Sequence, residues 1–282
     1  MLRELKGMTV GVVGGKGKMG SWLCSKLEEV GLKVMVSDKK GGKDIHTLAR
    51  DCQIIILSLP FQSLRTVMEE MSPFMTKDSL LMDMGSIKEQ PLKIMLELNP
   101  GPVVGTHPLF GPESFNSWDL KVILCPGRGE NAIALATALW KQLGCETFVL
   151  SAEEHDRIMG IAQGVFHFTS IVMAKLLYDA APKDRSALNK ASTANFQKAL
   201  ERIKSILSQP SWLFGDILIE NRYSFLWIKR FLGEAEALAD ILLRKDVQTY
   251  SSLFQKLGEV FKDEGDMGQD KGMGQGVALS SD

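Results

Sequence analysis

The sequence has little of several features that mark particular classes of protein. Its 33 lysines and arginines nearly balance its 34 aspartates and glutamates, which gives a net charge of −1. A nucleic-acid binder needs a basic face to meet phosphates, so this balance argues against one. It also gives no reason to expect an anionic membrane surface as a partner. No apolar run reaches the roughly 18 residues that a membrane span needs.

Cysteine is also scarce, with four in 282 residues. These are Cys24, Cys52, Cys125 and Cys145, and each lies in or beside an apolar run without forming a C-x-x-C pair. We therefore expect reduced, packed thiols in a cytoplasmic protein, and no zinc or redox site. The N-terminal stretch lacks a long apolar segment with a small-residue cleavage site, so we expect no signal peptide.

Short apolar segments alternate with helical stretches from Thr9 to about Leu150. They are rich in Val, Ile, Leu and Met and do not alternate with polar residues, as expected when both faces of a parallel sheet are covered. The expected strands are Thr9–Val13, Lys33–Ser37, Gln53–Leu59, Ser79–Asp83, Val103–Thr106, Lys121–Cys125 and Thr147–Leu150. The alternation predicts a doubly wound α/β domain over residues 1–150.

The character of the chain changes at Ser151. Ser151 and Glu154 have the spacing of a capping box, and apolar residues then recur at helical spacing. We expect an all-helical domain over residues 151–262, whose apolar helices need a partner and therefore predict a homodimer. The last segment, 263–282, is rich in Gly, Asp and Gln, and we expect it to be disordered.

A glycine-rich loop directly follows the first expected strand and opens a helical stretch that Gly31 ends. Gly15, Gly17 and Gly20 form a G-x-G-x-x-G pattern, with Lys18 and Met19 between the last two glycines. The first glycine is expected to allow the tight turn, the second the approach of a pyrophosphate, and the third close helix–strand packing. The pyrophosphate would meet the N–H groups of the helix N-terminus. This context predicts a dinucleotide site.

Asp38 ends the second expected strand, 18 residues after Gly20. A carboxylate there binds ribose hydroxyls and repels a 2′-phosphate, which favours NAD over NADP. Lys39 and Lys40 follow and could instead meet a 2′-phosphate, although a solvated turn is the simpler interpretation. Ser58, Leu59 and Pro60 close the third expected strand at the edge where ligands bind in open α/β sheets, so they could wall the nicotinamide pocket.

Three further side chains are expected near that edge. Ser86 and Lys88 follow the strand that ends at Asp83, and His107 follows the next one. An imidazole with a pKa near 6.5 can take a proton from a hydroxyl at neutral pH, but a histidine bonded to backbone in a turn is equally consistent with the residue type. His155 could not share a metal ion with the next histidine, twelve residues on, because about 18 Å of helix would separate them.

Three segments together resemble the prephenate dehydrogenase family. They are MDMGSIKEQP at 82–91, THPLFGPES at 106–114 and EEHDRIMGIAQGVFHF at 153–168, and the similarity extends to about Phe231. The resemblance implies a Rossmann domain followed by a helical dimerisation domain. It also implies oxidative decarboxylation of prephenate to 4-hydroxyphenylpyruvate with NAD, a step toward tyrosine. We expect no mutase domain before the nucleotide domain and no regulatory domain after the helices.

The resemblance also implies roles for individual residues. His107 matches the histidine that accepts the proton of the ring hydroxyl, and Ser86 matches the serine that helps to hold that hydroxyl. Gln163 and His167 match polar positions on the helix that faces the substrate. Arg222 lies one place from the expected position of an arginine that binds a substrate carboxylate, and Lys88 is a second candidate for that role.

Three alternatives remain open at this point. An arogenate dehydrogenase would perform the same chemistry on the amino-acid analogue and would need a carboxylate to meet the ammonium group. Another two-domain dehydrogenase of small substrates would share the glycine loop but not THPLFGP. A non-catalytic NAD-binding sensor would bind the cofactor without turnover.

Overall fold

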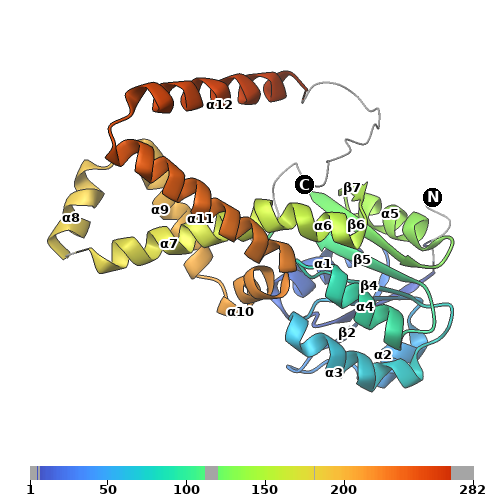
Figure 1. Ribbon diagram of the computed structural model, residues 1–282. Coiled ribbons are helices and arrows are strands. Elements are labelled where there is room, and N and C mark those ends of the chain that lie inside the picture. Colours follow the sequence, from blue (N-terminus) through green and yellow to red (C-terminus); the bar gives the residue numbers. More distant parts are fainter. Residues whose placement is uncertain (1–4, 6, 112–119, 181, 268–282) are drawn as a thin grey trace. The chain divides into compact units, whose positions relative to one another are not determined.

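The computed structural model describes residues 5, 7–111, 120–180 and 182–267. Contacts group the chain into two units, residues 1–228 and residues 229–282, and the boundary falls inside helix α11 (Arg222–Leu243). The first unit holds the sheet, the helices around it and most of the helical region (Figure 1). The boundary expected after residue 150 lies within this first unit and stays a prediction.

Seven strands form one sheet in the order β2-β1-β3-β4-β5-β6-β7. They are β1 (Thr9–Val13), β2 (Lys33–Ser37), β3 (Ile54–Leu57), β4 (Leu80–Asp83), β5 (Val103–Pro108), β6 (Lys121–Arg128) and β7 (Glu146–Val149). All neighbours are parallel except β5 and β6, which are antiparallel. The expected α/β fold is confirmed, but the sheet is mixed and mostly parallel. A buried apolar run identifies a strand without encoding its direction, so the sequence missed the reversal of β6.

Helices cover both faces of the sheet, as the doubly wound pattern predicts. On one face, α1 (Lys18–Glu29) and α5 (Ala132–Gln142) pack against β-strand residues such as Val12. On the other face, Val13 and the other strand side chains that point the same way pack against a second set of helices. That set is α2 (Ile45–Asp51), α3 (Phe61–Met71), the 3₁₀ turn η1 (Ser72–Phe74), α4 (Glu89–Leu98) and α6 (Ala152–Met159). The four cysteines lie free and buried in these two layers.

The helical region begins with the expected capping box, because the side chains and backbones of Ser151 and Glu154 bond reciprocally. The chain then continues through helices that include two π-helical segments. They are η3 (Gly160–Val165, π), α7 (Phe166–Asp179), α8 (Pro182–Ala191), α9 (Ala194–Leu207), α10 (Ser211–Gly215) and η4 (Asp216–Glu220, π). The start of α11 passes so close to η3 that a Cβ on Gly164 would lie 2.5 Å from the Ser224 hydroxyl. Glycine at 164 therefore sets the spacing of these two helices.

One continuous helical stretch, Ala152–Asp179, is long and apolar enough to span a membrane by length and composition, with a mean hydropathy of 1.3 over its most apolar window. A single such stretch is weak evidence, since helices of many water-soluble proteins pass the same test. Its first half carries His155 and Asp156, which are buried against the sheet domain. Its second half exposes apolar side chains, Val172 and Leu176 among them.

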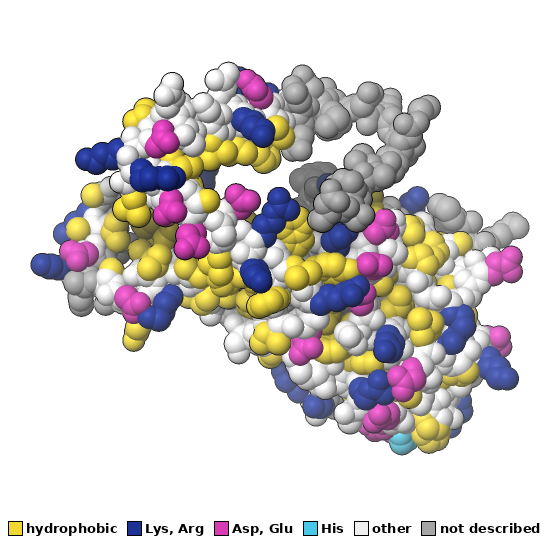
Figure 2. All heavy atoms as spheres, viewed as in Figure 1, with side chains coloured by type: hydrophobic (Ala, Val, Ile, Leu, Met, Phe, Trp, Pro, Cys, Tyr) yellow, Lys and Arg dark blue, Asp and Glu magenta, His cyan; other side chains and the backbone are white. Residues whose placement is uncertain are grey.

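The second unit contains most of α11, from Lys229 on, and helix α12 (Val247–Met267). Apolar side chains on these helices are widely exposed, including Leu243 at 80%, Phe254 at 67% and Phe261 at 69%. Figure 2 shows hydrophobic side chains gathered over the helical part of the chain. Helix α12 includes residues 263–267 of the segment expected to be disordered, and the rest of that segment lies outside the described residues.

Candidate active site

The glycine loop joins β1 to α1 in the expected strand–turn–helix arrangement. The positive φ that the turn requires, +80°, is at Gly14 and not at Gly15, which corrects the role assigned to Gly15. A Cβ on Gly14 would lie 2.2 Å from the Ser58 carbonyl oxygen, while a Cβ on Gly15 would meet Val36 at 2.7 Å. Gly15 therefore allows close packing against β2, and Gly14 both turns the chain and brings β1 next to β3.

The loop and the start of α1 fit a dinucleotide. Gly17 is the N-cap of α1 and supplies no side-chain cap, so the first N–H groups, from Lys18 and Met19 on, remain available to a pyrophosphate. A Cβ on Gly20 would lie 2.3 Å from the Gly14 carbonyl oxygen, so only glycine permits this helix to approach the loop. These features are those that a bound dinucleotide needs.

Asp38 lies just beyond the end of β2, beside the glycine loop. Its carboxylate accepts hydrogen bonds from the backbone N–H groups of Lys16 and Lys40, both at 2.9 Å. Slight burial raises the pKa of Asp38, but these hydrogen bonds and the two lysine charges outweigh it and leave the pKa below its ordinary value. The side chain is therefore a carboxylate at neutral pH. Lys39, Lys40 and Lys43 line the same end of the cavity.

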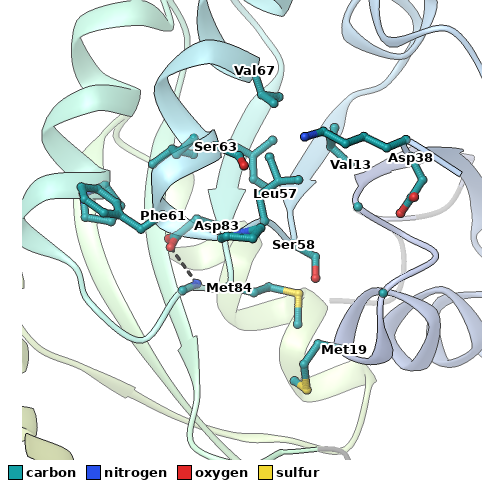
Figure 3. A pocket seen from close by; sticks show the side chains of 18 of the residues that line it. Val13, Met19, Asp38, Leu57, Ser58, Phe61, Ser63, Val67, Asp83 and Met84 are labelled. Carbon is teal, nitrogen blue, oxygen red and sulfur yellow. Dashed lines mark hydrogen bonds between the residues drawn. The ribbon is translucent and has the colours of Figure 1, made fainter. Parts of the chain in front are cut away.

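A cavity of about 850 Å³ extends along the carboxyl edge of the sheet from the glycine loop. Ser58, Leu59 and Pro60 line it after β3, as expected, and Met84 to Ile87 line it after β4. The side chains of Met19, Ser58 and Met84 point into one shared space (Figure 3). The helical region closes part of the cavity with Trp212, Leu213 and Asp216.

His107 lies on β5, next to the strand whose following loop lines the cavity, and is 2% exposed. Its Nδ1 is 2.8 Å from Nε2 of His155, and its Nε2 is 3.4 Å from the amide nitrogen of Gln163. Burial, followed by the proximity of His155 and Lys88, holds the pKa of His107 well below its ordinary value. The imidazole is therefore neutral near pH 7 and able to accept a proton.

Ser86 lines the cavity on the loop after β4, as expected. Among the residues that the structure describes, no hydrogen bond joins Ser86 to His107. That the two residues together bind a substrate hydroxyl therefore stays a prediction. Pro112, the last residue of the HPLFGP segment, lies outside the described residues.

Lys88 is fully buried, and its ammonium group has partners within the protein. Its ammonium group bonds the carboxylate of Asp83 and donates to the Thr106 carbonyl oxygen at 2.7 Å. These contacts join the ends of β4 and β5 beneath His107. They give Lys88 a structural partner in place of the substrate carboxylate that the sequence suggested.

Gln163 and His167 lie one turn apart on η3 and α7, and each carries a buried polar atom without a partner: Oε1 of Gln163 and Nδ1 of His167. Burial and the charge of Arg202 lower the pKa of His167 to about 4. The Arg202 guanidinium lies 4.0 Å above the ring of Phe166. In the described part of the chain, no carboxylate pairs with Arg202. This corner therefore offers a cation and two free polar atoms to a ligand.

Arg222 is exposed and has other partners. Its guanidinium bonds both carboxylate oxygens of Glu89 at 2.9 Å and lies 3.5 Å from Glu153. The Tyr223 hydroxyl, which accepts from Arg222, donates to Glu153. Arg222 therefore belongs to a surface network that ties α11 to α4 and α6, and these contacts do not support the substrate role suggested for it.

Sequence reasoning missed His155, Asp156 and Arg202. His155 was considered only as a metal ligand, although the adjacent His-Asp pair in EEHD was a visible signal. Arg202 had no local signal, because its contact with Phe166 spans two helices.

Two family models match the chain. The nucleotide-binding domain of prephenate dehydrogenase matches residues 25–149, and the dimerization domain of prephenate dehydrogenase matches residues 151–258. The chain belongs to the prephenate/arogenate dehydrogenase family. The suspected resemblance is thus confirmed.

Relatives in sequence agree with this assignment. The T-protein of Enterobacter agglomerans is 30% identical over 255 residues, which cover 89% of this chain and 67% of that protein. The probable arogenate/prephenate dehydrogenase of Methanocaldococcus jannaschii is 27% identical over 280 residues, which cover 93% and 63%. This chain spans about two thirds of the length of both relatives.

Solved structures show the same fold. A prephenate dehydrogenase from A. aeolicus in complex with hydroxyphenyl propionate and NAD+ superposes with a TM-score of 0.75 at 22% identity, covering 93% of this chain and 99% of that one. The Synechocystis arogenate dehydrogenase gives 0.71 at 16% identity, covering 92% and 100%. At these identities the likeness shows the fold alone.

Proposed function

We propose that this chain catalyses the oxidative decarboxylation of prephenate to 4-hydroxyphenylpyruvate, with NAD as hydride acceptor. The observation that carries the proposal is a neutral, buried His107 at the edge of the sheet, next to the strand whose following loop lines the cavity. Membership of the family supports the reaction class. The glycine loop and Asp38 support a dinucleotide with free ribose hydroxyls.

In this mechanism the protein positions the substrate and removes the proton of its ring hydroxyl. His107 accepts the ring hydroxyl proton at Nε2, and the electron pair of the O–H bond forms the carbonyl as hydride leaves the same carbon. The bond to the ring carboxylate then breaks, its electron pair aromatises the ring, carbon dioxide leaves, and the phenolate oxygen takes the proton back from His107. NAD, when bound, supplies the hydride acceptor. Ser86, from the loop after β4, orients the hydroxyl in this proposal, and Gln163 and His167 contribute polar contacts.

Prephenate carries two carboxylates and needs cations, whereas arogenate replaces the side-chain keto group with an ammonium group that needs a carboxylate. Three carboxylates around this part of the molecule already have partners: Asp83 with Lys88, Asp156 with His155, and Glu89 with Arg222. Arg202, in contrast, is available to an anion. An available cation and carboxylates that already have partners together favour prephenate over arogenate.

The test is an NADH-absorbance assay of the purified protein with prephenate and with arogenate, each with NAD and with NADP. We expect the highest kcat/KM for prephenate with NAD. His107→Asn should lower kcat by about 10²–10⁴-fold with little change in KM. Faster turnover of arogenate would replace the substrate assignment, and NAD binding without any turnover would indicate a sensor.

We also propose that the protein is a homodimer formed through its helical region. The support is the match to a dimerization domain and the exposed apolar side chains of α7, α11 and α12. Sedimentation at micromolar concentration should show a dimer. The double substitution Phe254→Glu and Phe261→Glu should shift it to monomer, while Glu259→Lys on the same helix should not. A fully active wild-type monomer would contradict the proposal.

A further inference from the structure

A chain of three buried side chains extends from the proposed base into the protein. Nδ1 of His107 lies 2.8 Å from Nε2 of His155, and Nδ1 of His155 lies 2.8 Å from Oδ1 of Asp156. All three residues are at most 3% exposed. His107 comes from β5, and the other two come from α6, 48 residues later. This arrangement lies on the side of His107 away from Gln163.

The carboxylate of Asp156, at the far end of these three hydrogen-bonded side chains, determines where each proton between them lies. Oδ1 of Asp156 accepts the backbone N–H of Lys88 at 2.8 Å, and Oδ2 accepts that of Glu89 at 2.9 Å. Both oxygens are therefore acceptors at the N-terminus of α4, where a carboxylate is favoured. Nδ1 of His155 must then carry the proton, its Nε2 must accept, and Nδ1 of His107 must donate.

We propose that His155 and Asp156 are positioning residues that fix His107 in the tautomer with a proton on Nδ1 and a lone pair on Nε2. The inference rests on the proposed function, because it gives that lone pair its task. The amide nitrogen of Gln163, which faces Nε2 at 3.4 Å, is a donor and agrees with an unprotonated Nε2. Without this chain, both tautomers of a neutral imidazole would compete and only one could act as base.

The same series of hydrogen bonds stabilises the imidazolium that forms when His107 takes up the proton. When Nε2 takes the hydroxyl proton, His107 becomes an imidazolium whose Nδ1–H already donates to His155. The carboxylate of Asp156, behind His155, offsets the new positive charge. Lys88 and Asp83 are the other charged groups near the two histidines, and they neutralise each other as an ion pair. Asp156 is thus the carboxylate in this cluster that can stabilise a positive charge on His107.

The decisive measurement is nitrogen NMR of the full-length protein with 15N-labelled histidine, with and without NAD. We expect His107 to show a protonated Nδ1 and an unprotonated Nε2 in the wild type. His155→Met should remove the acceptor and change this tautomer, whereas His155→Gln, whose amide oxygen can still accept, should keep it. This readout needs no turnover, so it separates failure of the inference from failure of the proposed function.

Kinetics give the second readout. His155→Met should lower kcat by about 10²-fold or more, and His155→Gln by less than about tenfold, with the dissociation constant of NAD unchanged in both. Because His155 acts through His107, the double variant with His107→Asn should be no slower than His107→Asn alone. A wild-type His107 protonated at Nε2 would overturn the inference even if the variants fail to fold. So would an unchanged tautomer in His155→Met, or fully additive losses in the double variant.

Discussion

Asp216, in the helical region, accepts a hydrogen bond at 3.2 Å from the backbone N–H of Phe61, the first residue of α3. The other carboxylate oxygen accepts from the side-chain amide of Gln62. The two ends of this contact are 155 residues apart in sequence, and both Phe61 and Asp216 line the cavity. A single side chain therefore holds a helical wall of the cofactor cavity against the loop that follows β3.

Replacing Asp216 should weaken both the fold and cofactor binding. Asp216→Ala leaves the Phe61 N–H without its partner, so we expect the free energy of unfolding to fall by about 1–3 kcal/mol. The cavity wall loosens at the same time, so the dissociation constant of NAD should rise. Urea unfolding at fixed protein concentration and fluorescence titration with NAD measure these effects. Glu220→Ala, an exposed carboxylate of the same π-helical segment, is the control and should change neither quantity.

Asp38 should decide the choice between NAD and NADP. Its carboxylate would repel a 2′-phosphate, while Lys39, Lys40 and Lys43 around it could bind one. Asp38→Ala should therefore raise the dissociation constant of NAD and lower that of NADP. Calorimetric titration with each cofactor tests this, with Asp51→Ala as a surface control. Tighter binding of NADP by the wild-type protein would contradict the prediction.

The two arginines discussed above should behave differently toward substrate. Arg202 has no carboxylate partner in the described part of the chain, so Arg202→Gln should raise KM for prephenate about ten- to a hundredfold, the value of one charge-assisted hydrogen bond. Arg222 is held by Glu89, so Arg222→Gln should leave KM within about threefold. Steady-state kinetics at saturating NAD compare the two. The opposite ranking would restore Arg222 to the substrate site.

Acid should destabilise the protein partly through His167. Burial and Arg202 lower its pKa to about 4 in the folded chain, whereas the unfolded side chain has a pKa near 6.5. Its contribution to stability is therefore complete above pH 6.5 and is lost as the pH falls toward 4. At pH 5 the expected loss is about 1–2 kcal/mol.

A matched variant isolates this contribution. His167→Asn should lower stability at pH 7.5 but should show a smaller difference between pH 7.5 and pH 5 than the wild type. Urea unfolding at the two pH values gives both differences. Equal pH dependence in the wild type and His167→Asn would rule out the role of His167.

The sequence predicted the sheet well because each strand is a short run of buried apolar residues between turn signals. Thr9–Val13 and Lys33–Ser37 have the expected bounds, and the capping box at Ser151 is present. Each of these features is encoded within a few neighbouring residues. The direction of β6 was missed because direction depends on which strand it meets and not on its own residues.

The site was harder to predict, since its contacts join distant residues. His107 was identified from its place after a strand, but its bond to His155 crosses 48 residues and needs the fold. Lys88 was taken for a ligand-binding cation because its charge was visible and its burial was not. Gly14 supplies the turn in place of Gly15, since the sequence pattern shows that glycines are needed but not which of them has the left-handed conformation.

The wide turn of the π-helical segment η3 determines which side chains of this helix can face His107. In a regular α-helix, residues eight apart, such as His155 and Gln163, differ by about 80° around the axis, and the wider turns of a π-helix reduce that angle. Gln163 reaches His107 because of this adjustment. An ordinary helix would need one residue fewer to place the two side chains as closely, because residues seven apart in it differ by only about 20°. The wide turn thus accommodates the extra residue and keeps His155 and Gln163 on one side of the helix, where both contact His107.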